Sequence, residues 1–240
     1  MYRFAFFFFL FLVMSLPAWA CGVTERTGAP QVQVPGISIC RTGYELLYRP
    51  EYKTAFWSAE HVTAKSVKGK YERSDDFDSD PLVPDHLEAQ LSDYFKSGYA
   101  RGHLAPVGNF RDDPREAQES FYLTNMIPQW QNCNNAGVWS QIERVVRDWA
   151  VHYGELYVVT GPIYQGEVKT IGNGVRVPDQ LFKVVWNPTL NTTVGFVVPN
   201  VPLCKTKPKD FAVRVEQVEF LTGIKFFPKV KPESTDRLWN

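Results

Sequence analysis

The residues with the clearest chemical capability are Arg101 and His103, which lie in the segment Ser97–Pro106 with only Gly102 between them. An arginine guanidinium can hold a phosphate at any pH, and a histidine can take a proton from water near neutrality. Together they are two of the three parts needed to hydrolyse a phosphodiester, and the third is a metal ion.

A candidate metal anchor follows at Asn135, with Glu143 and Arg147 eight and twelve residues further along the chain. On one helix, these three residues fall within about a third of the circumference, so that a carbonyl oxygen, a carboxylate and a guanidinium face one direction. The start of a helix also favours a phosphate. Because Mg²⁺ keeps most of its waters, one asparagine amide can serve as its protein anchor.

Each of these residues also has a simpler interpretation. A histidine beside a glycine is commonly an ordinary surface or core residue, and an asparagine at a helix start is usually a cap. Glu143 and Arg147 have the spacing of a solvated ion pair worth about 0.3 kcal/mol. It is their joint order along the chain that favours a catalytic site.

The element that must position this group is a helix beginning at Asn134 or Asn135, either of which could cap it. Apolar residues then recur at helical spacing: Val138, Ile142, Val145, Val146 and Trp149.

Other segments predict a mixture of strands, helices and loops. The segment Pro30–Arg49 is read as irregular with short extended pieces, Lys70–Pro84 as a surface loop, and Asp210–Thr222 as a final amphipathic helix. Four segments are read as strands: Thr54–Ala59 continuing through His61–Ala64, Phe121–Asn125, Leu156–Thr160 and Thr193–Val198. With no regular alternation of strand and helix, the pattern indicates an α+β fold.

Residues 1–20 have the pattern of a secretory signal peptide: a basic start at Arg3, a short apolar run, a proline and an Ala-x-Ala end. The alternative, a transmembrane anchor, needs about 20 apolar residues, and this run is shorter. Cys21 raises the idea of a lipoprotein, against which the bulky Trp19 argues. We therefore expect a secreted or periplasmic protein with no membrane segment once the signal is removed.

Charge and length limit the function classes. Without residues 1–20 the chain loses Arg3 and keeps 25 Lys and Arg against 26 Asp and Glu. This balance excludes a protein that holds nucleic acid by overall positive charge, so any such contact needs a local arginine cluster. The remaining 220 residues predict one domain, 21–240.

The four cysteines, Cys21, Cys40, Cys133 and Cys204, lack the close pairs typical of zinc sites. They are interpreted as two disulfides, for which three connectivities are open. We favour Cys21–Cys40 and Cys133–Cys204.

Taken in order, these motifs resemble the non-specific DNA/RNA endonuclease family. The family pattern Asp-Arg-Gly-His is similar to Ala100–Pro106, and an aromatic strand followed by Asn-x-x-Pro-Gln is similar to Phe121–Gln129. The pattern Asn-x-x-x-Trp-x-x-x-Glu-x-x-x-Arg is matched by Asn135, Trp139, Glu143 and Arg147. An upstream motif resembles Arg73–Asp80, and the family's C-terminal helix resembles Glu219–Phe227.

The resemblance implies a mixed or antiparallel sheet flanked by helices, with a ββα-metal motif at the site. It implies an endonuclease that cuts both DNA and RNA to 5′-phosphorylated products. His103 would be the general base and Asn135 the ligand of a single hydrated Mg²⁺ or Mn²⁺. Glu143 would hold metal-bound water, and Asn125 would fix the local geometry. Three side chains would clamp the phosphate: Arg73, Arg101 and Arg147.

Two departures from the family pattern are visible. Ala100 stands at the family's aspartate position, so a carboxylate beside Arg101 is missing. One extra residue precedes the helix, which leaves Asn134 as an alternative to Asn135 for the metal. A catalytically silent nucleic-acid-binding protein on the same fold is the alternative function. Oligomeric state and any preference for DNA or RNA stay open.

Overall fold

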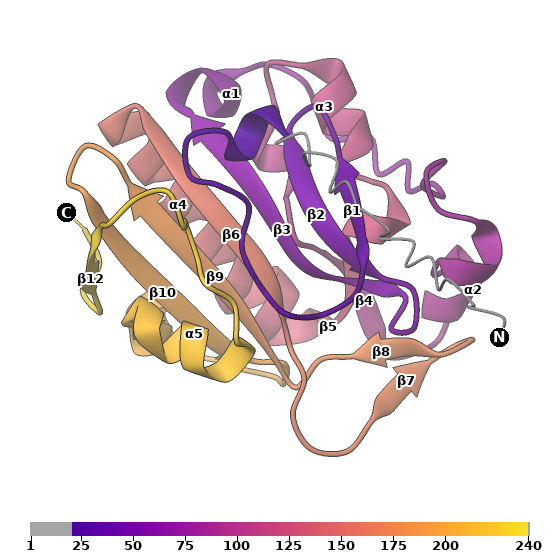
Figure 1. The fold of residues 1–240 in the computed structure, drawn as a ribbon. Coiled ribbons are helices and arrows are strands. Elements are labelled where there is room, and N and C mark those ends of the chain that lie inside the picture. Colours follow the sequence, from indigo (N-terminus) through magenta and orange to yellow (C-terminus); the bar gives the residue numbers. More distant parts are fainter. Residues whose placement is uncertain (1–20, 240) are drawn as a thin grey trace, which may run out of the picture.

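The centre of the molecule is an eight-stranded sheet, seen in the computed structural model, which describes residues 21–239 (Figure 1). The strands lie in the order β1-β2-β3-β6-β9-β10-β11, each antiparallel to its neighbours, and β12 pairs in parallel with β10. Their bounds are β1 Ile37–Cys40, β2 Tyr44–Arg49, β3 Thr54–Thr63, β6 Glu155–Ile163, β9 Gln180–Asn187, β10 Thr192–Pro199, β11 Ala212–Val213 and β12 Glu233–Thr235.

Helices cover both faces of this sheet. Helix α4 (Ser140–Tyr153) lies behind it in Figure 1 and α5 (Val215–Thr222) lies in front. Along β6, Leu156 and Val158 belong to the core on the α4 side, whereas Tyr157 and Val159 belong to the core on the α5 side. Alternate side chains of a strand point to opposite faces, so a strand covered on both sides is apolar throughout. The predicted α+β fold is confirmed.

A second, two-stranded sheet packs against η5 (Gln131–Trp139), the segment that leads into α4. Strand β4 (Tyr99–His103) pairs antiparallel with β5 (Met126–Trp130), with Arg101 opposite Pro128. The chain leaves β5 through η5, which is an irregular helical segment, and enters α4 directly. Two strands followed by a helix form the ββα arrangement that the family resemblance implied.

The remaining elements are short. They are α1 Ala64–Lys68, α2 Leu91–Tyr94, α3 Pro114–Glu119, the hairpin of β7 Lys169–Ile171 and β8 Val175–Val177, and the single turns η1 Gly22–Thr24, η2 Asp85–Leu87, η3 Val107–Asn109, η4 Leu123–Asn125 and η6 Pro208–Phe211. The segment Lys70–Pro84 has no helix and is a loop as predicted, with one isolated bridge from Asp78 to Tyr122.

The predicted helix start at Asn134 or Asn135 is wrong, because regular helix begins only at Ser140. Within η5 the backbone leaves helical angles at four residues, among them Cys133 at φ 61° and Gly137 at φ −143° and ψ −117°. Cys133 is bound to Cys204, a constraint from 71 residues away that the local pattern does not contain.

Three further boundaries differ from the predictions. Phe121–Asn125 is not a strand, since Leu123–Asn125 forms a helical turn and the strand starts at Met126. The last helix starts at Val215, because the chain before it pairs with the sheet as β11. The segment Pro30–Arg49, predicted as irregular with short extended pieces, contains two regular strands, β1 and β2.

Both favoured disulfides are present, Cys21–Cys40 and Cys133–Cys204, and no cysteine of residues 21–239 is free. The predicted signal peptide, residues 1–20, lies outside the described residues. Across residues 21–239, every helix is too short or too polar to cross a bilayer.

Candidate active site

The residues to which the sequence analysis assigned catalytic, phosphate-binding and metal-binding roles lie around one cavity of about 610 Å³. They come from the 70–84 loop, β4, η5 and α4, four segments that the fold brings together. The cavity wall includes all of them: Arg73, Arg101, His103, Asn135, Glu143 and Arg147.

His103 ends strand β4 and is only 8% exposed. Its ring lies 5.6 Å from Phe77 and 5.2 Å from Phe121, measured between ring centroids, and its buried Nε2 has no hydrogen-bond partner. Burial lowers the pKa of His103 to about 3, and the positive charges of Arg73 and Arg101 act in the same direction. The imidazole is therefore neutral at physiological pH and able to accept a proton.

The glycine between Arg101 and His103 is required by the neighbouring strand. A Cβ at Gly102 would lie 2.3 Å from Oε1 of Gln129, which stands on β5. Gln129 in turn donates from Nε2 to Oδ1 of Asn134 at 3.0 Å. This hydrogen bond connects β5 to η5.

The two candidate asparagines have different surroundings. Asn134 is fully buried, and its Nδ2 donates to the carbonyl oxygens of Pro199 at 2.7 Å and Val201 at 2.8 Å. Asn135 lines the cavity, and its Nδ2 donates to Gln131 at 2.9 Å. The carbonyl oxygen of Asn135 remains as an acceptor beside the cavity, whereas the side chain of Asn134 is engaged in the structure.

The arginines of the cavity are oriented by aromatic rings and one acid. The guanidinium of Arg101 lies 4.1 Å from the centre of the Phe77 ring, and that of Arg73 lies 5.6 Å from Phe121. Arg73 Nε also donates to Asp75 at 2.5 Å. Cation–π contacts of this kind hold a guanidinium at an apolar wall while its N–H groups stay available.

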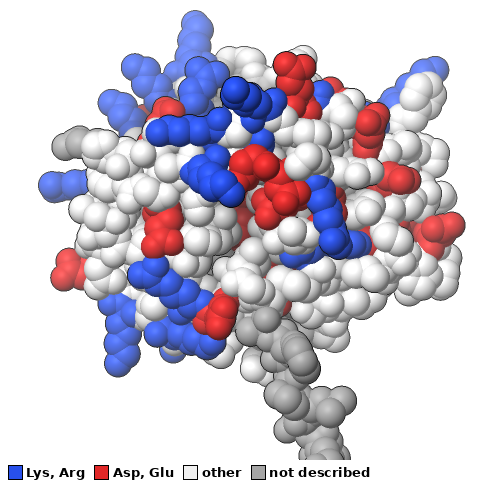
Figure 2. All heavy atoms as spheres, turned by 90° about the horizontal axis from the view of Figure 1, so that it is seen from above, with Lys and Arg blue, Asp and Glu red and all other residues white. Residues whose placement is uncertain are grey.

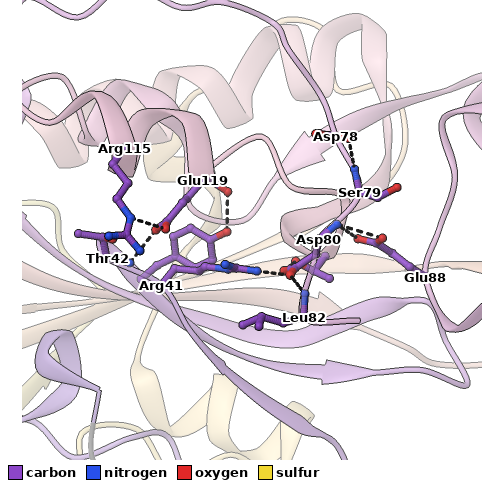
Figure 3. Close-up of polar contacts among 11 residues, drawn as sticks. Arg41, Thr42, Asp78, Ser79, Asp80, Leu82, Glu88, Arg115 and Glu119 are labelled. Carbon is purple, nitrogen blue, oxygen red and sulfur yellow. Dashed lines mark hydrogen bonds and ion pairs between the residues drawn. The ribbon is translucent and has the colours of Figure 1, made fainter. Parts of the chain in front are cut away.

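The loop that carries Arg73 is anchored by Asp80, which is 1% exposed (Figure 3). Its carboxylate pairs with Arg41 and accepts from Thr124 at 2.6 Å, and its backbone N–H donates to Glu88 at 2.9 Å. Burial raises the pKa of Glu88 to about 8. Asp80 is the last acid of the motif Arg73–Asp80, and the structure shows that it connects this loop to the core.

Helix α4 supplies Glu143 and Arg147, one turn apart on the cavity side. A Cβ on Gly108 would come within 3.0 Å of Arg147 Nη1, so this glycine leaves room for the guanidinium. Burial raises the pKa of Glu143. This increase is opposed by the positive charges of Lys183, Arg147 and Arg73.

Two buried charged residues under α4 were missed by the sequence analysis. Lys183 on β9 is 1% exposed and donates to Thr160 Oγ1 at 2.5 Å, and Glu60 on β3 is 2% exposed and accepts from Asn109 at 2.9 Å. Burial raises the pKa of Glu60 to about 7 and lowers the pKa of Lys183. The charge of each residue partly opposes the pKa shift of the other. A lysine inside the apolar run Leu181–Trp186 was the available signal.

Asn125 lies outside the cavity wall and is fully buried. Its Oδ1 accepts from the backbone N–H of Ala105 at 3.0 Å, and its Nδ2 donates to the carbonyls of Ala105 and Ser120, both at 2.8 Å. These bonds hold the chain that follows His103.

The donor set fits a hydrated divalent ion. Nowhere in residues 21–239 do three or more His, Cys, Asp or Glu side chains gather in a way that could hold a metal. What the cavity offers is the free carbonyl of Asn135 with the Glu143 carboxylate in the same wall. Mg²⁺ retains several waters and needs few protein oxygens, so this sparse set suits it.

Surface charge does not single out a broad basic face in the view of Figure 2. Lys and Arg gather toward the left of that face, and Asp and Glu lie among them near its middle. This mixture of signs agrees with the formal net charge of +0.

The sequence of this chain was compared with those of known protein families and proteins. Residues 24–233 match the family model described as DNA/RNA non-specific endonuclease. The mitochondrial nuclease EXOG of Danio rerio is 33% identical over 215 residues, covering 82% of this chain and 62% of its own length. Nuclease 1, mitochondrial, of Schizosaccharomyces pombe is 35% identical over 210 residues, covering 78% and 65%.

A solved structure has the same fold. A chain in the crystal structure of the EndoG/EndoGI complex superposes with a TM-score of 0.80 at 31% identity, covering 85% of this chain and 90% of that one. The chain spans about three fifths of the length of the Danio rerio relative.

These relatives correct the predicted location. The expected secreted or periplasmic location is wrong, because relatives from Danio rerio, Saccharomyces cerevisiae, Homo sapiens and Schizosaccharomyces pombe are mitochondrial nucleases. The prediction rested on an apolar run that follows a single arginine. Hydrophobicity and charge of this kind do not by themselves specify the compartment.

Proposed function

The chain belongs to the DNA/RNA non-specific endonuclease family, and on this premise we propose that it is a metal-dependent endonuclease that hydrolyses phosphodiester bonds in DNA and RNA. The observation that carries the proposal is the single cavity in which a neutral buried histidine, an asparagine carbonyl, a carboxylate and three arginines meet. The predicted domain, 21–240, is proposed to be one catalytic unit that releases 5′-phosphorylated fragments.

His103 is the general base in this proposal. Its lowered pKa keeps the imidazole unprotonated, so that it can take a proton from a water attacking phosphorus in line with the leaving 3′ oxygen. The aromatic rings of Phe77 and Phe121 keep the imidazole at the cavity wall. The hydrogen bonds of Asn125 to Ala105 hold the backbone that follows it.

Three arginines bind the phosphate from different segments. Arg73, Arg101 and Arg147 line the cavity, and charge-assisted N–H donors orient the scissile group and compensate the charge that develops on its oxygens. Phe77 holds the guanidinium of Arg101, and Gly108 leaves the space that Arg147 occupies.

Family membership implies a divalent metal ion, and we propose Mg²⁺, with Mn²⁺ as a substitute. The carbonyl oxygen of Asn135 would hold it, and Glu143 would accept hydrogen bonds from its waters. When bound, the ion supplies positive charge to the transferring phosphoryl group and the leaving oxygen.

The test is incubation of the purified protein with plasmid DNA and with RNA, in Mg²⁺ and in chelator. We expect both polymers to be cut in Mg²⁺ only, and His103→Ala to reduce cleavage by about a thousandfold while the circular dichroism spectrum is unchanged. Intact polymers in Mg²⁺, together with retained binding, would replace this proposal with the catalytically silent binding protein.

A further inference from the structure

A second cavity of about 580 Å³ adjoins the candidate active site. The two cavities share four wall residues: Arg73, Arg101, Gln131 and Asn135. A polymer whose phosphate lies between the arginines therefore passes from one cavity into the other. The second cavity is where the nucleotide next to the scissile phosphate would lie.

The wall of this second cavity carries an unusually exposed aromatic ring. Phe95, the residue that follows α2, is 73% exposed, and Leu91 at the start of that helix is 44% exposed. Large apolar side chains gathered beside a polar cavity are typical of a binding surface. An exposed phenylalanine ring offers a flat face on which a nucleobase can stack.

The turn after Phe95 is well defined. Lys96 has φ 54° and Gly98 has φ 84°, and the hydroxyl of Ser97 donates to the carbonyl of Tyr94 at 2.8 Å and accepts from the Tyr99 N–H at 3.1 Å. A turn held by these bonds presents the ring with little loss of freedom when a ligand binds.

Charge in this cavity favours a nucleotide over an uncharged aromatic ligand. Lys96 Nζ lies 5.1 Å from the centre of the Phe95 ring, and Arg73 and Arg101 stand in the same wall with Asp75. Ala100 adds a small neutral side chain there. A ring with a cation beside it matches a base joined to its phosphate.

We propose that the second cavity is a base-stacking subsite in which Phe95 receives an unpaired nucleobase next to the scissile phosphate, with Lys96 near its backbone. This proposal rests on the proposed function. In a duplex both faces of a base are already stacked, so the subsite is filled well only by single-stranded or locally opened nucleic acid. Phe95 is thus a specificity-determining residue.

The first measurement is binding without cleavage. In chelator, the affinity of Phe95→Ala for a labelled single-stranded oligonucleotide is expected to fall by about tenfold, and that for the same oligonucleotide annealed to its complement by less than twofold. Phe95→Trp is expected to keep the single-strand affinity. Phe220→Ala is the matched control, since Phe220 on α5 is 88% exposed and belongs to neither cavity wall.

The second measurement is cleavage in Mg²⁺. Phe95→Ala is expected to raise KM for the single strand by about tenfold while kcat stays within about twofold. Equal effects on single strand and duplex, or no effect on either, would overturn the subsite even if the wild-type protein cuts both polymers. If the wild-type protein cuts neither, while Phe95→Ala still weakens single-strand binding in chelator, the subsite stands and the proposed function falls.

Discussion

At the scale of single residues, the protonation state of His103 follows from its burial. The ring is removed from water and lies against Phe77 and Phe121, so the charged form loses hydration, and the nearby Asp75 compensates only part of that loss. Its pKa is about 3 in the folded protein, against about 6.5 for an unperturbed histidine. The neutrality of the imidazole at physiological pH is therefore linked to the folding equilibrium.

This shift predicts a pH-dependent contribution to stability. Between pH 6.5 and 3 the unfolded chain binds a proton at His103 and the folded chain does not, so the unfolding free energy falls as pH falls through this window. Relative to His103→Asn, the wild-type protein should lose about 2.5 kcal/mol between pH 7 and pH 4.5. Urea denaturation of both proteins at the two pH values measures this, and a constant difference would contradict it.

The wild-type protein must be compared with His103→Asn because buried acids change the unfolding free energy with pH in the opposite direction. The pKa of Glu60 is raised to about 7 and that of Glu88 to about 8, so these groups destabilise the fold as pH rises toward neutrality. They are present in both proteins and cancel in the difference.

At the scale of elements, glycines determine how closely the active-site segments approach. Gly108 lies in η3 against the guanidinium of Arg147 on α4, with 3.0 Å from a would-be Cβ to Nη1. The neighbour is the end of a flexible side chain, so an added methyl group displaces the guanidinium more readily than it disrupts the fold.

Gly108→Ala is therefore expected to lower kcat/KM by about tenfold, since small displacements of a phosphate-binding group are costly for catalysis. The melting temperature should change by only a few degrees. Gly22→Ala is the matched control, because nothing lies within 4 Å of a Cβ built there. Unchanged cleavage by Gly108→Ala would show that Arg147 binds the phosphate from another position or not at all.

Hydrophobic periodicity predicted those helices and strands whose apolar residues face the core at regular spacing. Val138, Ile142 and Val146 recur at helical spacing and pack against the sheet, and β6 and β10 were visible as apolar runs. The start of α4 was not predictable, because it depends on contacts with Cys204 and with the chain at Pro199, which are distant in sequence.

In the candidate site, too, some residues could be found from the sequence and others only from the packing. The residues around the cavity had been selected by type and order, and the fold places them in one wall. Lys183 and Glu60 escaped notice because a charged residue within a strand does not show by itself which face it occupies. Only the packing of α4 over β3 and β9 reveals that they lie beneath Glu143.

At the scale of the whole molecule, the site depends on ties between segments that are far apart in sequence. Asp80 ties the loop of Arg73 to Arg41, and Gln129 ties β5 to η5 through Asn134. The disulfide from Cys133 to Cys204 closes 71 residues and fixes η5 directly beside Asn135, whereas Cys21–Cys40 closes 19 residues near the start of the described chain.

The two disulfides should therefore differ in their effect on metal dependence. Loop length alone predicts that removing Cys133–Cys204 costs about 4 kcal/mol of unfolding free energy and removing Cys21–Cys40 about 3 kcal/mol. Only the Cys133→Ser/Cys204→Ser protein is expected to need severalfold more Mg²⁺ for half-maximal cleavage, because only that bond restrains the backbone carrying Asn135. Titrating cleavage against Mg²⁺ below both melting temperatures, with Cys21→Ser/Cys40→Ser as control, separates loss of stability from loss of positioning. The same half-maximal Mg²⁺ in both variants and in the wild-type protein would limit the Cys133–Cys204 bond to a role in stability.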